Sequence, residues 1–293
     1  MTDRLGRLAL GTVQFGLRYG VANTSGQVSP DEAAAIVAHG REAGLRTLDT
    51  AMAYGDSERR LGEIGVTDWE VVSKIPPVPA DCADIAAWVD DCVRASLARL
   101  GVTTLKGVLL HRAADLAGPQ GARLYAAMAA LKQRGAVTKI GVSIYGPEEL
   151  EALDPDYRLD LVQAPFNVVD RRLVVSGSLT RLLRAGTEVH CRSAFLQGLL
   201  LMASPTRPPV FQRWQSLWDR WHQWLEEQSL TPLQACLGFV LAQPGIARVV
   251  VGVDSLAQFE EILAAARTPS VCPPSTLMSS DLDLIDPSRW RTQ

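Results

Sequence analysis

The sequence of 293 residues lacks any run of about 18 consecutive apolar residues, although 47% of its residues are hydrophobic. A membrane-spanning helix needs such a run, so no segment is expected to cross a membrane. The first residues also lack the apolar stretch of a signal peptide. We therefore expect a cytoplasmic protein whose hydrophobic residues form a large core.

Clusters of basic residues and paired cysteines are also missing. The 29 Lys and Arg residues are outnumbered by 32 Asp and Glu residues, and no basic block occurs. Because nucleic acid is bound by clustered Lys and Arg, it is not an expected partner. The five cysteines are an odd number without C-x-x-C spacing, which favours reduced thiols and predicts no metal site. Nothing in the sequence indicates self-association.

Short apolar runs alternate with longer amphipathic segments along the whole chain. Strands that alternate with helices pair in parallel through right-handed crossovers, and eight such units can close into a barrel. The rival fold, an open doubly wound sheet, would carry G-x-G-x-x-G after its first strand, and that motif is absent. The sequence therefore predicts one α/β domain over residues 1–293, a (β/α)8 TIM barrel. The predicted strands are residues 8–10, 46–48, 70–73, 107–110, 139–142, 159–162, 187–190 and 248–251.

The eighth unit is long, with one helix expected over residues 210–228 and a second over 232–241. The first carries Trp214, Trp218 and Trp221 at helical spacing. This spacing favours burial against the barrel or a second subunit, and a platform for stacking sugars is the alternative. The C-terminal tail either covers one mouth of the barrel or is a loosely held terminus.

Four polar side chains follow consecutive predicted strands: Asp49 and Tyr54 after the second, Lys74 after the third and His111 after the fourth. Each alone has a structural explanation, such as a cap, a solvated strand end or a packing aromatic. Together they would meet at one mouth, because the carboxyl ends of barrel strands share it. Such a set suits proton delivery to a carbonyl oxygen. Tyr54 would be the general acid, Lys74 would lower its pKa, Asp49 would hold the ammonium and His111 would orient the carbonyl.

This pattern, D-x-x-x-x-Y-G, then S-K, then L-L-H, resembles that of the aldo-keto reductases, and the resemblance runs from Gly11 past Glu261. It implies an NAD(P)H-dependent reductase of aldehydes or ketones that needs no metal. The segment GTVQFGLRYGVAN, residues 11–23, resembles a bacterial branch of the family that is linked to sugar and surface-polysaccharide metabolism. This resemblance suggests a sugar-like substrate. The alternatives are a nucleotide-binding sensor or channel-subunit-like protein with little turnover, and an NAD-dependent sugar dehydrogenase. A Schiff-base enzyme using Lys74 is disfavoured, since a lysine paired with Asp49 stays protonated.

The resemblance also implies the nucleotide contacts. Ser143 and Gln163 match the partners of the carboxamide. Arg192 stands where many relatives place an aromatic residue under the nicotinamide, and it would either stack by its guanidinium plane or bind a phosphate or an acidic substrate. The implied set is Gly11, Thr12, Asp49, Ser143, Gln163, Arg192, Ser193, Phe195, Gly198, Gly252, Asp254, Gln258 and Glu261.

The choice between nucleotides depends on one acidic position. The family as a whole favours NADP(H), which is the preferred expectation, with NAD(H) as the alternative. Asp254 would repel a 2′-phosphate and accept a hydrogen bond from a ribose hydroxyl instead. No Lys or Arg occurs in residues 251–261 to offset it.

Overall fold

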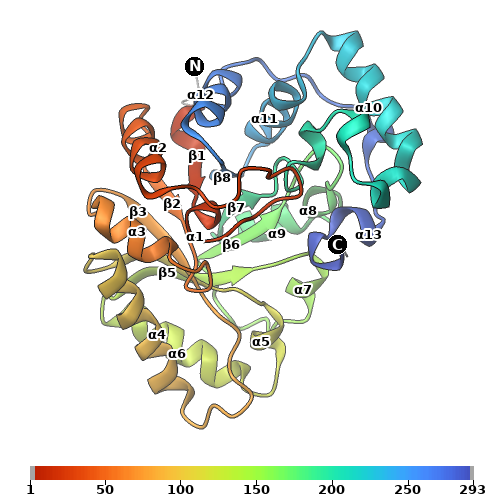
Figure 1. Ribbon diagram of the computed structural model, residues 1–293. Helices are drawn as coiled ribbons and strands as arrows, with labels where there is room; N and C mark the ends of the chain where they lie inside the picture. Colours follow the sequence, from red (N-terminus) through yellow and green to blue (C-terminus); the bar gives the residue numbers. More distant parts are fainter. Residues whose placement is uncertain (1–3, 291–293) are drawn as a thin grey trace.

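The computed structural model describes residues 4–290 and closes eight parallel strands into a barrel in sequence order (Figure 1). The first strand pairs with both the second and the last, so that Gly11 lies opposite Asp49 on one side and Gly252 on the other. The predicted TIM barrel is confirmed, with small shifts at the strand ends. The strands are β1 (Leu8–Gly11), β2 (Thr47–Asp49), β3 (Glu70–Ile75), β4 (Leu105–Leu110), β5 (Val137–Ser143), β6 (Leu161–Pro165), β7 (Glu188–Arg192) and β8 (Arg248–Gly252).

Helices surround the barrel, and local sequence sets several of their ends. Ser29 accepts a hydrogen bond from the Glu32 backbone N–H ahead of Pro30, and Thr231 forms a capping box with Gln234. No helix within residues 4–290 combines the length and apolar character needed to cross a bilayer. The helices are α1 (Val13–Gly16), α2 (Pro30–Glu42), α3 (Ser57–Ile64), α4 (Ile85–Leu100), α5 (Ala114–Ala117), α6 (Gly121–Gln133), α7 (Glu148–Glu151), α8 (Arg172–Val175), α9 (Ser178–Arg184), α10 (Gln215–Gln228), α11 (Pro232–Ala242), α12 (Leu256–Ala265) and α13 (Leu282–Ile285).

A second hydrophobic cluster lies beside the barrel, around α10. The helix begins at Gln215, later than expected, because residues 209–214 form a 3-10 helix. Trp218 and Trp221 are buried, and their indole N–H groups donate to the Phe211 and Leu200 carbonyls at 2.9 and 3.1 Å. The predicted burial is therefore confirmed within one chain, and these two rings are not available as a sugar platform.

The C-terminal tail packs against this second cluster. Leu284 and Ile285 of α13 are buried there, and the Ser279 N–H donates to the Val169 carbonyl at 3.0 Å. The tail is thus docked rather than loosely held, and no residue from 269–290 lines the cavity at the mouth of the barrel.

Charged side chains fill the barrel interior at its amino-terminal end. Glu188 of β7 pairs with Lys139 of β5, and Glu70 of β3 lies 3.5 Å from Arg248 of β8. These pairs join strands that are not neighbours, so they cross the interior. His190 is also buried, and its Nε2 lies 2.8 Å from Glu188 Oε1. The charged residues at this end therefore form a network that stabilises the barrel. The predicted catalytic residues lie at the opposite end.

Candidate active site

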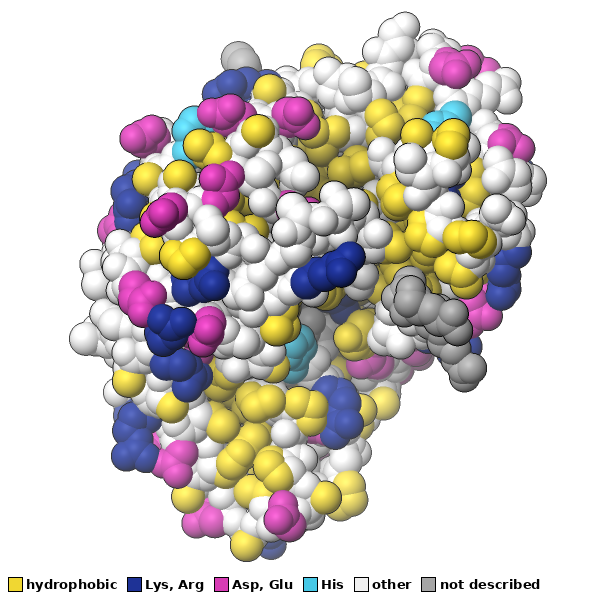
Figure 2. Space-filling model, in the orientation of Figure 1, with side chains coloured by type: hydrophobic (Ala, Val, Ile, Leu, Met, Phe, Trp, Pro, Cys, Tyr) yellow, Lys and Arg dark blue, Asp and Glu magenta, His cyan; other side chains and the backbone are white. Residues whose placement is uncertain are grey.

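A cavity of about 350 Å³ opens at the carboxyl ends of the strands. Asp49 at the end of β2, Tyr54 on the following loop, Gln163 in β6 and Arg192 at the end of β7 line it together. These positions are far apart in sequence and are brought to one mouth by the barrel. On the face of the molecule in Figure 2, side chains of both charge signs are interspersed.

Lys74 lies beneath the cavity surface and forms a buried ion pair with Asp49. The lysine Nζ donates to Asp49 Oδ1 at 2.6 Å and to the Thr50 carbonyl at 2.9 Å. Gln163 Nε2 donates to Asp49 Oδ2 at 2.6 Å, so both carboxylate oxygens are bound. Burial lowers the pKa of Lys74, and the neighbouring Asp49 opposes this shift. The pair therefore holds the lysine amino group in one place inside the barrel.

Tyr54 stands next to this pair and lines the cavity. Lys74 Nζ lies 5.3 Å from the centre of the Tyr54 ring. Burial raises the pKa of Tyr54 and the charge of Asp49 adds to the rise, whereas Arg192 opposes it. The net shift of the Tyr54 pKa is therefore upward and not downward as expected, because burial, with the charge of Asp49 added, outweighs the nearby cations. The phenol keeps its proton at neutral pH.

His111 packs edge to face against Tyr54, with ring centres 5.7 Å apart. Burial, and then the charge of Lys74, lower the pKa of His111 to about 4. The imidazole is therefore neutral at physiological pH and carries one N–H to donate. It does not itself line the cavity described above.

The loop that carries Tyr54 is held by close backbone contact with α1. A Cβ atom on Gly16 would lie 1.7 Å from the Tyr54 carbonyl oxygen, so only glycine allows this approach. Ser57 Oγ donates to the Thr12 carbonyl at 2.8 Å, and Thr12 Oγ1 donates to the Asp49 carbonyl at 3.1 Å. The ends of β1 and β2 thereby fix the tyrosine.

Of the nucleotide-binding residues implied by the resemblance, all but Ser143 line the same cavity. Ser143 is buried at the end of β5, opposite Gln163 in the neighbouring strand. At the other end of the cavity, Gln258 Oε1 accepts from the Asp254 N–H at 2.9 Å, and Ser255 caps α12. Within residues 4–290, no cluster of His, Cys, Asp or Glu is placed to hold a metal ion.

The segment of residues 17–28, which we call the mouth loop, crosses in front of β7 and β8 (Figure 1, dark red). Its Asn23 Nδ2 donates to Asp254 Oδ1 at 2.8 Å, and its Val21 N–H donates to the Gln197 carbonyl at 3.1 Å. Gly198 has a φ of +88°, and a Cβ there would lie 2.6 Å from the Ala22 Cβ. The loop after β7 and the mouth loop therefore touch over the cavity.

Sequence reasoning missed several cavity residues, among them the polar side chains of Gln14 and Asn23. Both lie within GTVQFGLRYGVAN, the segment that resembles the bacterial branch. That segment was therefore the sequence signal that could have identified them. Tyr19, in the same stretch, also lines the cavity. Gln14 Oε1 is buried without a hydrogen-bond partner among the described residues, and it faces Gly252.

Arg192 occupies the mouth from the side of β7. Its Nη2 donates to the Ile144 carbonyl at 2.9 Å, and its Nη1 donates to Ser193 Oγ at 3.2 Å. The guanidinium carbon lies 4.8 Å from the centre of the Tyr145 ring. The arginine is thus held over an aromatic ring of its own chain.

Comparisons with known sequences point to one family. The profile of the Aldo/keto reductase family matches residues 7–271. An aldo-keto reductase from Mycolicibacterium vanbaalenii is 32% identical over 131 residues, which are 43% of this chain and 45% of that protein. The match thus spans less than half the length of this curated relative.

Solved structures agree. The protein PA4992 of Pseudomonas aeruginosa, assigned as an aldo-keto reductase, is 26% identical with a TM-score of 0.65, covering 89% of both chains. The aldo-keto reductase AKR11C1 from Bacillus halodurans, in its holo form, has a TM-score of 0.68 at 19% identity. That match covers 90% of this chain and 88% of the other, and at this identity it supports the fold alone. Because the family profile matches most of the chain, this protein belongs to the aldo/keto reductase family.

Proposed function

We propose that the protein reduces an aldehyde or ketone to an alcohol with a nicotinamide nucleotide, using Tyr54 as the general acid. The observation that carries this proposal is the buried pair of Lys74 and Asp49 set against the Tyr54 ring at the wall of the cavity. A structural ion pair alone would not need a phenol facing the cavity beside it. Membership of the family is consistent with this activity.

The residues at the mouth fit a nicotinamide dinucleotide. The cavity extends from Tyr54 to Glu261, and glycines at Gly11, Gly198 and Gly252 expose backbone along it. Gln14 adds a buried amide oxygen without a partner among the described residues. When bound, the nucleotide supplies the hydride that the side chains cannot. Residues of the family pattern, Gln163 and Ser193 among them, would hold it.

The side chains then handle the proton. Tyr54 is protonated at neutral pH because burial raises its pKa, so it holds the proton that a carbonyl oxygen takes up on reduction. Lys74, whose Nζ lies near the ring, and Arg192, whose charge lowers the Tyr54 pKa, stabilise the phenolate left behind. At an effective dielectric near 20, a cation about 5 Å away contributes roughly 3 kcal/mol, which the carboxylate of Asp49 reduces. His111 donates its N–H to the carbonyl oxygen and sets its angle.

We further propose NADP(H) as the cofactor, with NAD(H) as the competing choice. The general preference of the family supports NADP(H). The carboxylate of Asp254, which Asn23 orients at the cavity, supports NAD(H). Burial raises the pKa of Asp254, but the Asn23 hydrogen bond opposes this and favours the charged form.

The test is direct. The purified protein is mixed with NADPH or NADH and a panel of small aldehydes and ketones, including open-chain sugars, and nucleotide absorbance is followed. Continued loss at catalytic amounts of protein is the expected result. A single stoichiometric turnover would instead indicate a nucleotide-binding sensor, and no oxidation at all would refute the reductase proposal.

A further inference from the structure

We propose that Arg192 binds an acidic group of the substrate, so that the preferred carbonyl compounds carry a carboxylate. This inference rests on the proposed reductase function and names the substrate class of the same cavity. It depends on the position of the guanidinium, on the residues that hold it and on the charges around it.

The guanidinium is held in one place from several sides. It donates to the Ile144 carbonyl and to Ser193 Oγ and lies over the Tyr145 ring. A flexible surface arginine would point into water and contact little. Here the guanidinium of Arg192 is held rigidly, so its remaining N–H groups point in a fixed direction. Less entropy is therefore lost when a ligand binds to them.

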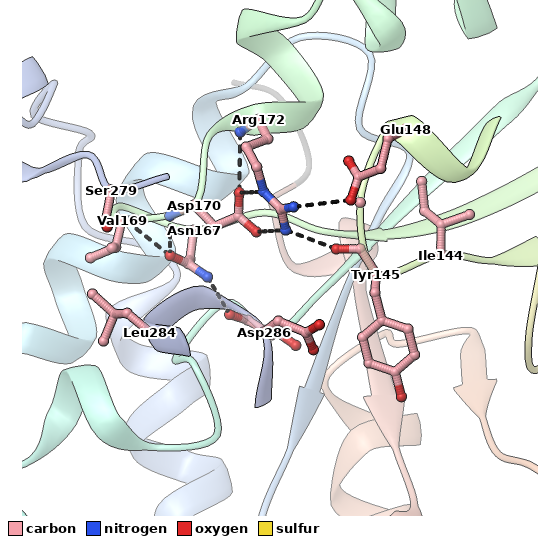
Figure 3. Close-up of polar contacts among 12 residues, drawn as sticks. Ile144, Tyr145, Glu148, Asn167, Val169, Asp170, Arg172, Ser279, Leu284 and Asp286 are labelled. Atoms are coloured by element: carbon pink, nitrogen blue, oxygen red, sulfur yellow. Dashed lines mark hydrogen bonds and ion pairs between the residues drawn. The ribbon is translucent and has the colours of Figure 1, made fainter. Parts of the chain in front are cut away.

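The residues that hold Arg192 are anchored in turn, as Figure 3 shows for the β5 side. The Tyr145 carbonyl accepts from Arg172 Nη2 at 2.8 Å. Arg172 is paired with the buried carboxylate of Asp170, with Nε to Oδ1 at 3.0 Å and Nη2 to Oδ2 at 2.9 Å. The loop that carries Tyr145 is therefore tied to the start of α8, and the α8 residue Arg172 is held by charge-assisted bonds to Asp170.

The β7 side is anchored as well. Asn167 Nδ2 donates to the Ser193 carbonyl at 3.1 Å, and Asn167 Oδ1 accepts from the Val169 and Asp170 N–H groups. Ser193 itself has a φ of +59°, in the left-handed region that is unfavourable for a serine. The surrounding bonds keep Ser193 in this unfavourable conformation. They thereby also fix the backbone next to Arg192.

The charge of Arg192 is not neutralised. Lys74 and Arg172 each pair with a buried carboxylate, but no carboxylate of residues 4–290 forms an ion pair with Arg192. Among the described residues that line the cavity, it is also the only Lys or Arg. A half-buried cation without a counterion is a site prepared for an anion, because bidentate pairing with a carboxylate uses the guanidinium fork.

The position of the guanidinium favours the substrate over the nucleotide phosphates. Its bond to Ile144 directs it to the end of β5, whereas Asp254 and Gln258 lie after β8, on the other side of β7. Its charge also acts on Tyr54 and His111, lowering the pKa of each. It therefore lies on the catalytic side of the cavity. With a single cation present, a carboxylate is a better match than a dianionic phosphate.

The experiment compares benzaldehyde with 4-carboxybenzaldehyde, which share a reactive group and differ in one carboxylate. Wild type, Arg192→Gln, Arg192→Lys and the control Arg184→Gln are assayed for KM and kcat with saturating nucleotide. Arg184 is exposed on α9 and gives the same change in charge outside the cavity. Arg192→Gln should slow the reduction of both aldehydes, because the arginine also stabilises the Tyr54 phenolate. The ratio of the KM for 4-carboxybenzaldehyde to the KM for benzaldehyde should nevertheless rise by roughly 10- to 100-fold. Arg192→Lys should fall between, and Arg184→Gln should match wild type.

Two outcomes would overturn the inference while leaving the reductase function intact. One is an equal loss of kcat/KM for both aldehydes in Arg192→Gln, which would mean that Arg192 acts only through its charge on Tyr54. The other is weaker nucleotide binding with an unchanged substrate ratio, which would assign it to the nucleotide. If wild type reduces neither aldehyde, these two compounds are not substrates, and the wider panel of aldehydes, ketones and sugars decides the reductase proposal. Calorimetric titration of the nucleotide-saturated protein with 4-carboxybenzoate then still decides, because equal affinity in wild type and Arg192→Gln overturns the inference.

Discussion

Asn23 and Asp254 are joined across the mouth of the barrel by a hydrogen bond of 2.8 Å between Nδ2 and Oδ1. Asn23 belongs to the mouth loop, and Asp254 follows β8. The bond therefore does two things: it closes the loop over the cavity, and it fixes the direction of a carboxylate at the proposed adenosine end. These two roles lead to separate predictions.

The first prediction concerns nucleotide choice. Asp254→Asn keeps an acceptor for Asn23 but removes the negative charge, so repulsion of a 2′-phosphate should disappear. Affinity for NADPH relative to NADH should rise roughly fivefold, as expected for one partly exposed charge, and Asp254→Ser should act in the same direction. Dissociation constants measured at low and high salt would show it. Glu260→Gln, an exposed carboxylate on α12, is the control; an unchanged ratio in Asp254→Asn would mean that the acid does not face the 2′ position.

The second prediction concerns nucleotide release. Asn23→Ala removes the bond that ties the mouth loop to Asp254, together with two bonds from the Asn23 side chain to the Gly26 backbone within the loop. The contact of Val21 with Gln197 remains. Release should become about fivefold faster, the equivalent of one hydrogen bond of about 1 kcal/mol. Stopped-flow displacement of bound nucleotide measures this rate. Thr24→Ala, exposed on the same loop, should leave it unchanged; equal rates in wild type and Asn23→Ala would show that the loop does not gate the nucleotide.

The third prediction concerns the proton donor. Tyr54→Phe keeps the ring that packs against His111 and Lys74 but removes the hydroxyl. Carbonyl reduction should fall by about 10²- to 10⁴-fold, while nucleotide affinity stays within about twofold. Steady-state kinetics and equilibrium dialysis measure the two quantities. Tyr157→Phe, whose ring stacks on Tyr125 away from the mouth, is the matched control. Near-normal turnover in Tyr54→Phe would remove Tyr54 from this role.

The fourth prediction concerns stability at the opposite end of the barrel. Hydrogen bonding to His190, and then to Lys139, lowers the pKa of Glu188 to about 2. A carboxyl whose pKa is lowered on folding stabilises the protein above its unfolded pKa of about 4.3, and this stabilisation is lost as the pH falls toward 2. Glu188→Gln should therefore lower the free energy of unfolding by about 2 kcal/mol at pH 7, after a discount for partial exposure, and by less at pH 3.

Urea unfolding of both proteins at the two pH values measures this difference. Glu42→Gln, on the exposed side of α2, should behave like wild type at both. A destabilisation of Glu188→Gln that is the same at pH 7 and pH 3 would show that the effect comes from packing and not from the charge of the carboxylate.

The barrel could be predicted from the sequence because its signals are local. Alternating apolar runs mark the strands, and caps such as Ser29 and Thr231 mark helix starts within a few residues. Once the strands are known, the barrel brings their carboxyl ends together, so the meeting of Asp49 and Tyr54 at one mouth follows from topology. These expectations required no knowledge of long-range side-chain contacts.

Other features of the site had no local signal. The bond from Asn23 to Asp254 joins loops at opposite ends of the chain, and the ring of Tyr145 under Arg192 depends on how two loops pack. The raised pKa of Tyr54 was missed for a related reason. Its value depends on burial and on how far Asp49 offsets Lys74, and a sequence gives neither depth nor distance. Only three-dimensional packing determines them.

The cluster around α10 determines what the intrinsic fluorescence of this protein reports. Of the seven tryptophans in the chain, five belong to it: Trp214, Trp218, Trp221, Trp224 and Trp290. Indole emission is therefore dominated by a side unit of the fold, and a change in that signal on heating follows the loosening of this unit, even where the strands of the barrel are still paired. Far-ultraviolet circular dichroism, which detects the helices and strands, would give a separate transition if the two parts melt independently.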